Sequence, residues 1–240
     1  MDFGVLLEDS FTYAKEGILG NMNRWLSLIL ATILLCIPLN GYLMRIYRGT
    51  TPAPEVDQWG TLFVDGLKLI IVGLIWAIPI MIVWFIAYGS MLMGAISGSM
   101  DPATLATWQP NMGLEVLLFV VEILVGIFTP IAFIRFARTG SFGEAFNFSA
   151  ILETIGKIGW ISYLLALIIV AVVIGIPLAI LTVAFMLIGG IAVALSGGGF
   201  LAFLAVLGLL MLILLILIPF ISVFQARYLT KMYESANPAA

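Results

Sequence analysis

The sequence contains no histidine and a single cysteine, Cys36. Both shortages limit the catalytic, metal and disulfide sites that the chain could form. Without histidine there is no imidazole to act as a general base or to ligate a metal. One cysteine excludes an internal disulfide and a thiolate cluster. Neither a Ser-Lys pair nor a pair of intramembrane aspartates is visible. We therefore expect no enzyme, and no metal or cofactor.

Charge is scarce as well: charged residues make up 10% of the 240 residues and hydrophobic residues 63%. A soluble domain has about 25% charged and roughly 45–50% apolar residues. Several apolar stretches exceed the roughly 18 residues that suggest a bilayer-spanning helix. Residues 116–134 are interrupted only by Glu122, and residues 158–195 and 200–224 carry no charge. This composition predicts an all-α polytopic membrane protein, and no basic stripe indicates binding to nucleic acid.

All ten basic residues lie in or beside the same set of gaps between the apolar stretches. None occurs between Leu69 and Ile134 or between Gly159 and Ala226. Because short cytoplasmic loops hold the Lys and Arg excess of bilayer proteins, these gaps mark the cytoplasmic face. We expect a multi-pass protein of the cytoplasmic membrane with its C-terminus in the cytoplasm.

Two hairpins of membrane spans are predicted, one over residues 69–135 and one over residues 159–227. In the first, Asp101 and Pro102 indicate the cap and first turn of a short helix that ends near Trp108. The hydrophobic segment 25–44 allows two topologies. A re-entrant hairpin that breaks at Pro38-Leu39-Asn40-Gly41 gives four spans and keeps every basic residue on one face. A single crossing gives five spans. We favour the re-entrant hairpin.

The chain matches itself when it is shifted by 139 residues, which aligns Gly20 with Gly159 and Pro38 with Pro177. A shift of 90 aligns Arg45 and Arg48 with Arg135 and Arg138. We predict one membrane domain made of three related units, residues 1–50, 56–138 and 142–231. Each unit has an amphipathic helix, an apolar segment or hairpin and a basic end. The amphipathic helices either rest at the lipid headgroups or pack on the helix bundle.

Small residues spaced four apart let membrane helices approach closely. Two such ladders are candidates for helix packing and for a homo-oligomer. They comprise Ser90, Gly94 and Gly98 in the first hairpin and Gly190, Ala194 and Gly198 in the second.

Glu122 lies within a predicted span, where a charged side chain costs about 2.5–3.5 kcal/mol. Glu115, Glu122 and Thr129 are seven residues apart and share one helix face, which we predict to be a polar seam facing the bundle interior. The seam is either a proton or cation relay or a protonated carboxyl group bonded to a neighbouring helix. We favour the second, because no other intramembrane acid or base accompanies Glu122.

The basic residues at the ends of the spans are candidates for contacts with lipid headgroups, because guanidinium groups suit phosphate. Anchoring by the positive-inside effect explains them equally well. The candidates are Arg45, Arg48, Arg135, Arg138, Arg227 and Lys231.

Two short motifs carry a resemblance to a known family. They are Gly41-Tyr42 followed by Arg45, and Trp59-Gly60 followed by Leu62-Phe63-Val64-Asp65-Gly66-Leu67-Lys68. Through them the sequence resembles the prokaryotic, largely archaeal, membrane family called domain of unknown function 4013. The resemblance covers most of the chain. It implies the membrane architecture and transfers no catalytic residue.

Two functions fit these observations. The first is a non-enzymatic membrane protein that organises lipid or partner proteins, with membrane lipids as partners. The second is a small proton- or ion-coupled transporter or channel that uses Glu122. A continuous polar cavity that reaches Glu122 would favour transport, whereas lipid-facing grooves would favour organisation.

Overall fold

The computed structural model of the chain describes residues 1–195, 197 and 199–236, and these residues contain helices and no strand. The elements in chain order are α1 (Phe3–Ala14), the π-helical turn η1 (Lys15–Leu19), α2 (Met22–Ile33), α3 (Ile37–Tyr47), α4 (Trp59–Ser97), α5 (Pro102–Thr107), α6 (Met112–Thr139), α7 (Phe142–Ala145), α8 (Phe148–Ile158), α9 (Trp160–Leu195) and α10 (Phe200–Glu234). The all-α class is confirmed.

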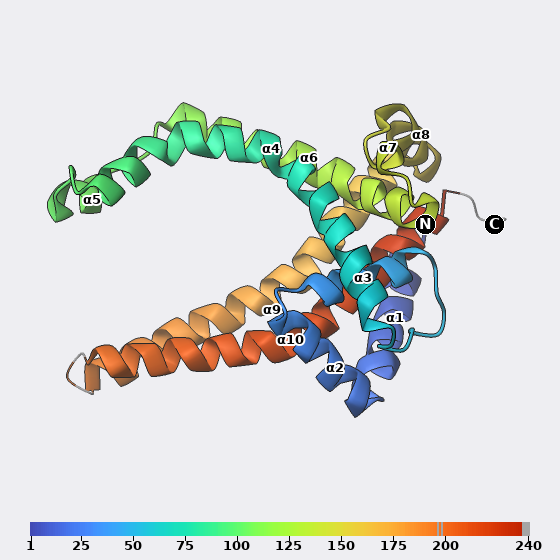
Figure 1. Ribbon diagram of the computed structural model, residues 1–240, viewed down its shortest axis with the longest axis horizontal. Helices are drawn as coiled ribbons and strands as arrows, with labels where there is room; N and C mark the ends of the chain where they lie inside the picture. Colours follow the sequence, from blue (N-terminus) through green and yellow to red (C-terminus); the bar gives the residue numbers. More distant parts are fainter. Residues whose placement is uncertain (196, 198, 237–240) are drawn as a thin grey trace.

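Four helices, α4, α6, α9 and α10, are long and apolar enough to cross a membrane. Helices α4 and α6 form one arm with α5 at its tip, and α9 and α10 form the other, as Figure 1 shows. The two arms diverge from a common base. We use "the base" for α1, η1, α2, α3, α7, α8, the segment 48–58 and the adjoining ends of the arms.

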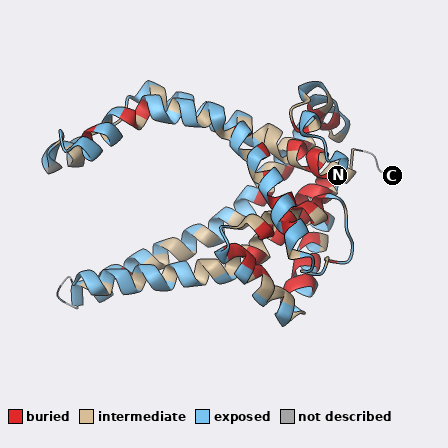
Figure 2. Cartoon of the chain, viewed as in Figure 1, coloured by how far each residue is buried: buried red, intermediate tan, exposed pale blue. Residues whose placement is uncertain are grey.

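Burial is concentrated in the base, while the arms are mostly exposed (Figure 2). At most 17% of the most apolar window of any of the four long helices is buried. Apolar surface of this extent is unfavourable in water and favourable in a hydrocarbon solvent. The splayed arms are therefore compatible with a bilayer around them.

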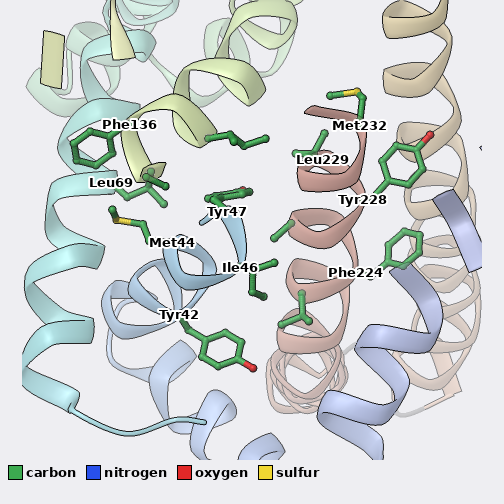
Figure 3. Close-up of a cluster of buried hydrophobic side chains, with 14 of the residues drawn as sticks. Tyr42, Met44, Ile46, Tyr47, Leu69, Phe136, Phe224, Tyr228, Leu229 and Met232 are labelled. Carbon is green, nitrogen blue, oxygen red and sulfur yellow. The ribbon is translucent and has the colours of Figure 1, made fainter. Parts of the chain in front are cut away.

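Helix α3 is the centre of the base, and Figure 3 shows the side chains around it. Its Tyr42 and Ile46 are fully buried. Leu69 of α4, Phe136 of α6 and Tyr228 of α10 belong to the same buried cluster. This short helix thus joins both arms into one packed unit.

The first hydrophobic segment forms a helical hairpin and not a single span. Leu35 and Cys36 adopt left-handed backbone conformations, with φ of 57° and 58°, and end α2 before α3 begins. Arg24 at the start of the segment pairs with the Glu55 side chain, and Arg45 near its end donates to the Glu55 carbonyl at 2.9 Å. Both ends of the segment therefore lie on the same side, as in the re-entrant topology, and the single crossing is wrong.

The break in this hairpin comes earlier than predicted, at residues 34–36 and not at 38–41. Pro38 lies in the first turn of α3. A proline is tolerated there because the first N–H groups of a helix have no intrahelical acceptor. Gly41 lies inside α3, where it has a packing role described below.

The structure confirms one of the helices predicted in the arms and corrects another. Helix α5 is confirmed: the Asp101 carboxylate accepts from the Thr104 N–H at 2.8 Å, and the helix ends at Thr107. A separate amphipathic helix at the start of the second unit is wrong, because Trp59 begins the continuous helix α4. Helix α9 continues through Pro177 for 36 residues, about 54 Å at 1.5 Å per residue. It exceeds the roughly 30 Å hydrocarbon core and must tilt or project.

Helices α1 and α8, the amphipathic helices of the first and third predicted units, pack on the base and still expose some apolar side chains. In α8, Ile151 and Ile155 are fully buried, whereas Phe148 is 52% exposed. In α1, Leu6 is buried and Phe11 is 50% exposed. Packing on the bundle accounts for one face of each helix, and the exposed apolar face stays available to lipid.

Candidate functional site

Helices α3 and α4 cross in backbone contact at two glycines. A Cβ atom on Gly66 would lie 1.8 Å from the Ile37 carbonyl oxygen, and one on Gly41 would lie 2.0 Å from the Leu62 carbonyl oxygen. No side chain fits at such distances, so glycine is required at both positions. The crossing brings the start of α4 against the centre of the base.

The segment between α3 and α4 is held by the neighbours of Gly41. The Tyr42 hydroxyl donates to the Pro54 carbonyl at 2.9 Å. Arg45 forms an ion pair with Asp57 at 2.5 Å. The residues of the two sequence motifs thus belong to a single structural unit of helix, connecting segment and helix.

Two arginines at matched positions of the predicted units exchange equivalent hydrogen bonds. Arg48 Nε donates to the Ala137 carbonyl at 3.0 Å, and Arg138 Nε donates to the Tyr47 carbonyl at 3.1 Å. Each arginine therefore satisfies a carbonyl in the last turn of the other helix, where such groups lack intrahelical donors. We call this pair of contacts the arginine exchange. It joins the end of α3 to the end of α6.

The six basic residues proposed as lipid-headgroup contacts all have carboxylate partners in the structure. The pairs are Arg45–Asp57, Arg48–Asp65, Arg135–Glu144, Arg138–Glu234, Arg227–Asp9 and Lys231–Glu234. The hydrogen bond from Arg135, followed by one from Asn147, holds the pKa of Glu144 below its usual value. These ion pairs link segments of the base, and contact of the same basic groups with lipid headgroups remains a prediction.

Arg227 is the most enclosed of these residues, with 4% of its surface exposed. Its Nε and Nη2 donate to the Asp9 carboxylate at 2.7 and 3.2 Å, and its Nη1 donates to the Thr51 hydroxyl at 2.7 Å. Its guanidinium lies 4.5 Å from the centre of the Tyr13 ring. Burial raises the pKa of Tyr13 to about 12, although Arg227 acts in the opposite direction. Sequence reasoning missed Asp9, Tyr13 and Thr51, because no local pattern pairs residues so far apart in the chain.

Arg227 borders a cavity of about 710 Å³, lined by charged and apolar residues, between α1, η1 and the segment 50–55. Arg24 lines it too and donates from Nη1 to the Gly17 carbonyl at 2.8 Å. Glu8 and Glu16 stand at its exposed rim. An acidic rim favours cationic over anionic solutes. Within the part of the chain that the structure describes, no group of three or more acidic or cysteine side chains could hold a metal ion.

The predicted polar seam does not face the interior of this chain. Glu115 and Glu122 are exposed, and Thr129 is half-buried with its hydroxyl bonded to the Val125 carbonyl at 2.5 Å. The prediction was wrong because the arms splay, so that a face of α6 that would be internal in a closed bundle has no helix opposite it. Glu122 also lies outside the lining of the groove that includes its neighbour Ile123.

The two ladders of small residues contribute little packing within the chain. Ser90, Gly190 and Ala194 are exposed. Gly94 is buried against Met100, Gly98 ends α4 with a φ of 67°, and Gly198 lies outside the described residues.

The close contact between α9 and α10 is made one residue earlier than predicted. A Cβ atom on Gly189 would lie 2.3 Å from Val206 Cγ1. Spacing along the sequence identified a run of small residues in α9 but not the face that meets α10.

The apolar hollows along the second arm include two grooves that involve more than one helix. One, of about 720 Å³, lies between α6, α9 and α10, where the two arms diverge, and we call it the fork groove. Gly126, Gly175 and Gln225 are among its lining residues. The other, of about 320 Å³, lies between α9 and α10 beside Phe11. Both grooves have apolar linings, apart from Gln225.

Comparison with known protein families gives a match over a large part of the chain. The family described as "Protein of unknown function (DUF4013)" matches residues 25–183, which is more than half of the chain. The matched range contains the glycine crossing and the arginine exchange, whereas α1 and α10 lie outside it. No curated protein and no solved structure matches the chain.

Proposed function

This chain belongs to the DUF4013 family of proteins of unknown function, and from that premise we propose that it is a membrane protein without catalytic machinery that organises lipid around two splayed helical hairpins. The base would lie at the cytoplasmic face, because all ten basic residues belong to it or to the adjoining ends of the arms. Both ends of the described chain would then be cytoplasmic.

The observation that carries the proposal is the divergence of the arms. Helices α4 and α6 pack on each other, as do α9 and α10, and the arms meet only near the base (Figure 1). The facing surfaces beyond that point are apolar and exposed. Apolar patches of this size are covered in the working protein. In a bilayer the available cover is lipid.

The amphipathic helices support the same function. Phe11 of α1 and Phe148 of α8 are about half exposed, at 50% and 52%, although each helix packs its other face on the base. Exposed aromatic rings on helices beside the ends of the spans suit the headgroup boundary. The protein would thus contact lipid both between its arms and around its base.

Transport through Glu122 has less support. A coupled transporter needs its acidic group in a solvent-accessible path across the membrane. Glu122 is exposed on the surface of α6 and does not line the fork groove.

The test is the structure of the full chain in nanodiscs of phosphatidylethanolamine and phosphatidylglycerol, determined by electron cryo-microscopy. We expect lipid density between the arms of each chain. Helices of a second copy that fill this space would reject lipid as the occupant. A parallel measurement of proton flux in vesicles compares Glu122→Gln with Glu115→Gln. Flux that only the first substitution removes would establish the transporter instead.

A further inference from the structure

The arginine exchange lies within a charged cluster of the base that holds more cations than carboxylates. We call it the exchange cluster, and its members are Arg48, Lys68, Arg138, Lys231, Asp65 and Glu234. We propose that this cluster binds the phosphate groups of anionic lipids in the membrane leaflet next to the base. The inference rests on the proposed function, because that function places the base at a membrane face. It adds a lipid class and a defined site.

Each carboxylate of the exchange cluster is shared between two cations. Asp65 lies 2.8 Å from Arg48 Nη2 and 3.9 Å from Lys68 Nζ. Glu234 is shared in the same way by the other two cations, at 2.8 and 3.5 Å. Four cations therefore meet two carboxylates, which leaves an excess of two positive charges in the cluster.

Five other cations of the chain each have a carboxylate of their own. These pairs are neutral, so among the paired cations the excess positive charge lies in the exchange cluster. The five neutral pairs are Arg24–Glu55, Arg45–Asp57, Arg135–Glu144, Lys157–Glu153 and Arg227–Asp9.

The cations of the exchange cluster are also more accessible than the arginines of the neutral pairs. Between 30% and 47% of each cluster side chain is exposed, against 18% or less for those four arginines. Arg48 bonds to the Ala137 carbonyl through Nε and pairs with Asp65 through Nη2. Arg138 uses the same two nitrogens. Within the described residues Nη1 of each guanidinium has no hydrogen-bond partner, so it can donate to an external phosphate oxygen.

The position of the cluster along the spans favours lipid phosphate over the acidic groups of a soluble protein. Lys68 directly precedes Leu69, where a long stretch without basic residues begins. Arg138 follows Ile134, the end of the apolar stretch of α6, by four residues, or about 6 Å. The headgroup region adds about 5–7 Å to each side of the hydrocarbon core. Arg138 therefore lies at the depth of lipid phosphates, and the arginine exchange keeps Arg48 at the same depth.

Anionic lipids suit this excess charge better than zwitterionic lipids do. Basic clusters at the cytoplasmic ends of spans attract anionic headgroups, and guanidinium groups match the geometry of phosphate. A zwitterionic headgroup carries an ammonium group beside its phosphate, and the excess positive charge repels that group. The exchange cluster should therefore select lipids by headgroup charge.

The test measures lipid affinities of the full chain in detergent by native mass spectrometry. The protein is titrated with phosphatidylglycerol and, separately, with phosphatidylcholine of the same acyl chains. We expect the first phosphatidylglycerol to bind at least about fivefold more tightly. Lys68→Gln and Lys231→Gln should each lower that affinity about fivefold, the change expected for one basic residue beside an anionic surface. Both variants keep the shorter ion pair of their carboxylate, and thermal stability in detergent checks that they fold.

The matched control is Lys157→Gln, which removes the same charge from a neutral pair. Lys157 also directly precedes an uncharged stretch, as Lys68 does. This control should change the affinity for phosphatidylglycerol by less than about twofold, because exposed charges at a distance are screened. Equal losses in the control and in the cluster variants would reveal a general effect of net charge and overturn the inference. Equal affinities of the unaltered protein for the two lipids would overturn it as well.

A second arm separates the lipid from a free anion. Inorganic phosphate, added in place of chloride at the same ionic strength, should leave phosphatidylglycerol bound. Displacement of the lipid would make the free anion the ligand and overturn the inference. Absence of headgroup selectivity would leave lipid between the arms unaffected. Helices of a second copy between the arms would reject the proposed function without changing these affinities.

Discussion

At the scale of single residues, the base depends on two positions where a side chain is missing. Gly41 and Gly66 let the backbones of α3 and α4 touch, and each glycine faces a carbonyl oxygen of the other helix. Close backbone contact maximises van der Waals packing, which drives helix association in membranes. The same two glycines belong to the motifs that identified the family from sequence.

Gly66→Ala should destabilise the protein strongly. Its Cβ atom would lie 1.8 Å from the Ile37 carbonyl oxygen, so the helices must separate. We expect the free energy of unfolding to fall by at least about 2 kcal/mol, towards the upper end of overpacking effects. Denaturant unfolding in micelles measures this change. The control is Gly60→Ala on the same helix, where an added Cβ atom meets nothing within 4 Å. Equal stability of the two variants would contradict the crossing.

Arg227→Ala should also destabilise the base. It removes the bonds to Asp9 and Thr51 and leaves a carboxylate without its partner. Loss of one member of a buried pair costs about 3–5 kcal/mol, and because Asp9 is 35% exposed we expect about 2–3 kcal/mol. Lys231→Ala, which removes a longer pair of 3.5 Å at one-third exposure, should change stability by less than about 0.5 kcal/mol.

A double-mutant cycle isolates the contact between Asp9 and Arg227. If the pair is coupled, Asp9→Ala combined with Arg227→Ala should cost at least about 1 kcal/mol less than the sum of the single substitutions. Simple additivity would show that Arg227 acts through its other contacts, the Thr51 hydroxyl and the Tyr13 ring.

At the scale of elements, the arginine exchange shows why the basic residues cluster at helix ends. Arg48 follows the last residue of α3, and Arg138 is in the last turn of α6. Positive charge there is favoured by the helix dipole. Each side chain then reaches the partner helix. A charge placement that first indicated membrane orientation also provides an inter-helix contact.

The α2–α3 hairpin makes a prediction about membrane sidedness. With Cys36→Ser as background, Asn23→Cys in the first turn of α2 and Gln58→Cys after α3 should react with a membrane-impermeant maleimide from the same side. Ala103→Cys, at the tip of the first arm, should react only from the other side. Intact cells and inverted vesicles distinguish the sides. Labelling of residues 23 and 58 from opposite sides would restore a single crossing.

Local signals in the sequence predicted some elements well. The proline and the capping aspartate of α5 act within a few residues of each other, and the structure has that helix. The basic residues favoured a re-entrant first segment, and the ends of that segment do meet at Glu55. The first feature depends on residues that are close together in the chain, and the second on the placement of basic residues relative to the membrane. Both can be read from the sequence without knowing how the helices pack.

Other features depended on how the helices are arranged in space. The small-residue ladders marked Gly190, whereas the contact uses Gly189, because spacing alone does not reveal which face meets the partner. Glu122 was expected inside a bundle and is exposed because the arms diverge. Arg138 and Arg227 pair with Glu234 and Asp9, which come from distant segments, so these ion pairs were not predictable. Three related units remain a prediction.

At the scale of the whole molecule, the protein is a wedge with a packed base and two open arms (Figure 2). Its buried cluster contains residues from both arms and from the hairpin between them. Stability is therefore concentrated at one end, and lipid contact at the other. A fold of this kind holds two hairpins at an angle without packing them on each other.

Electron spin resonance can measure the opening of the wedge. Spin labels at Ile96→Cys and Phe200→Cys, in the Cys36→Ser background, mark the tips of the two arms; both sites are exposed, at 73% and 71%. A closed bundle would bring them within about 20 Å, because packed helices lie 8–10 Å apart. We expect a clearly longer separation in vesicles. The pair Ile96→Cys and Met112→Cys, within one arm, is the control for a short distance.

The contact between Asp9 and Arg227 joins α1 to α10, 218 residues apart in the chain. During translation, Asp9 is therefore synthesised long before Arg227. Until α10 emerges, α1 lacks the helix on which it packs and Asp9 lacks its cation. A chain that stops before α10 therefore leaves the packing face of α1 uncovered and Asp9 without this partner.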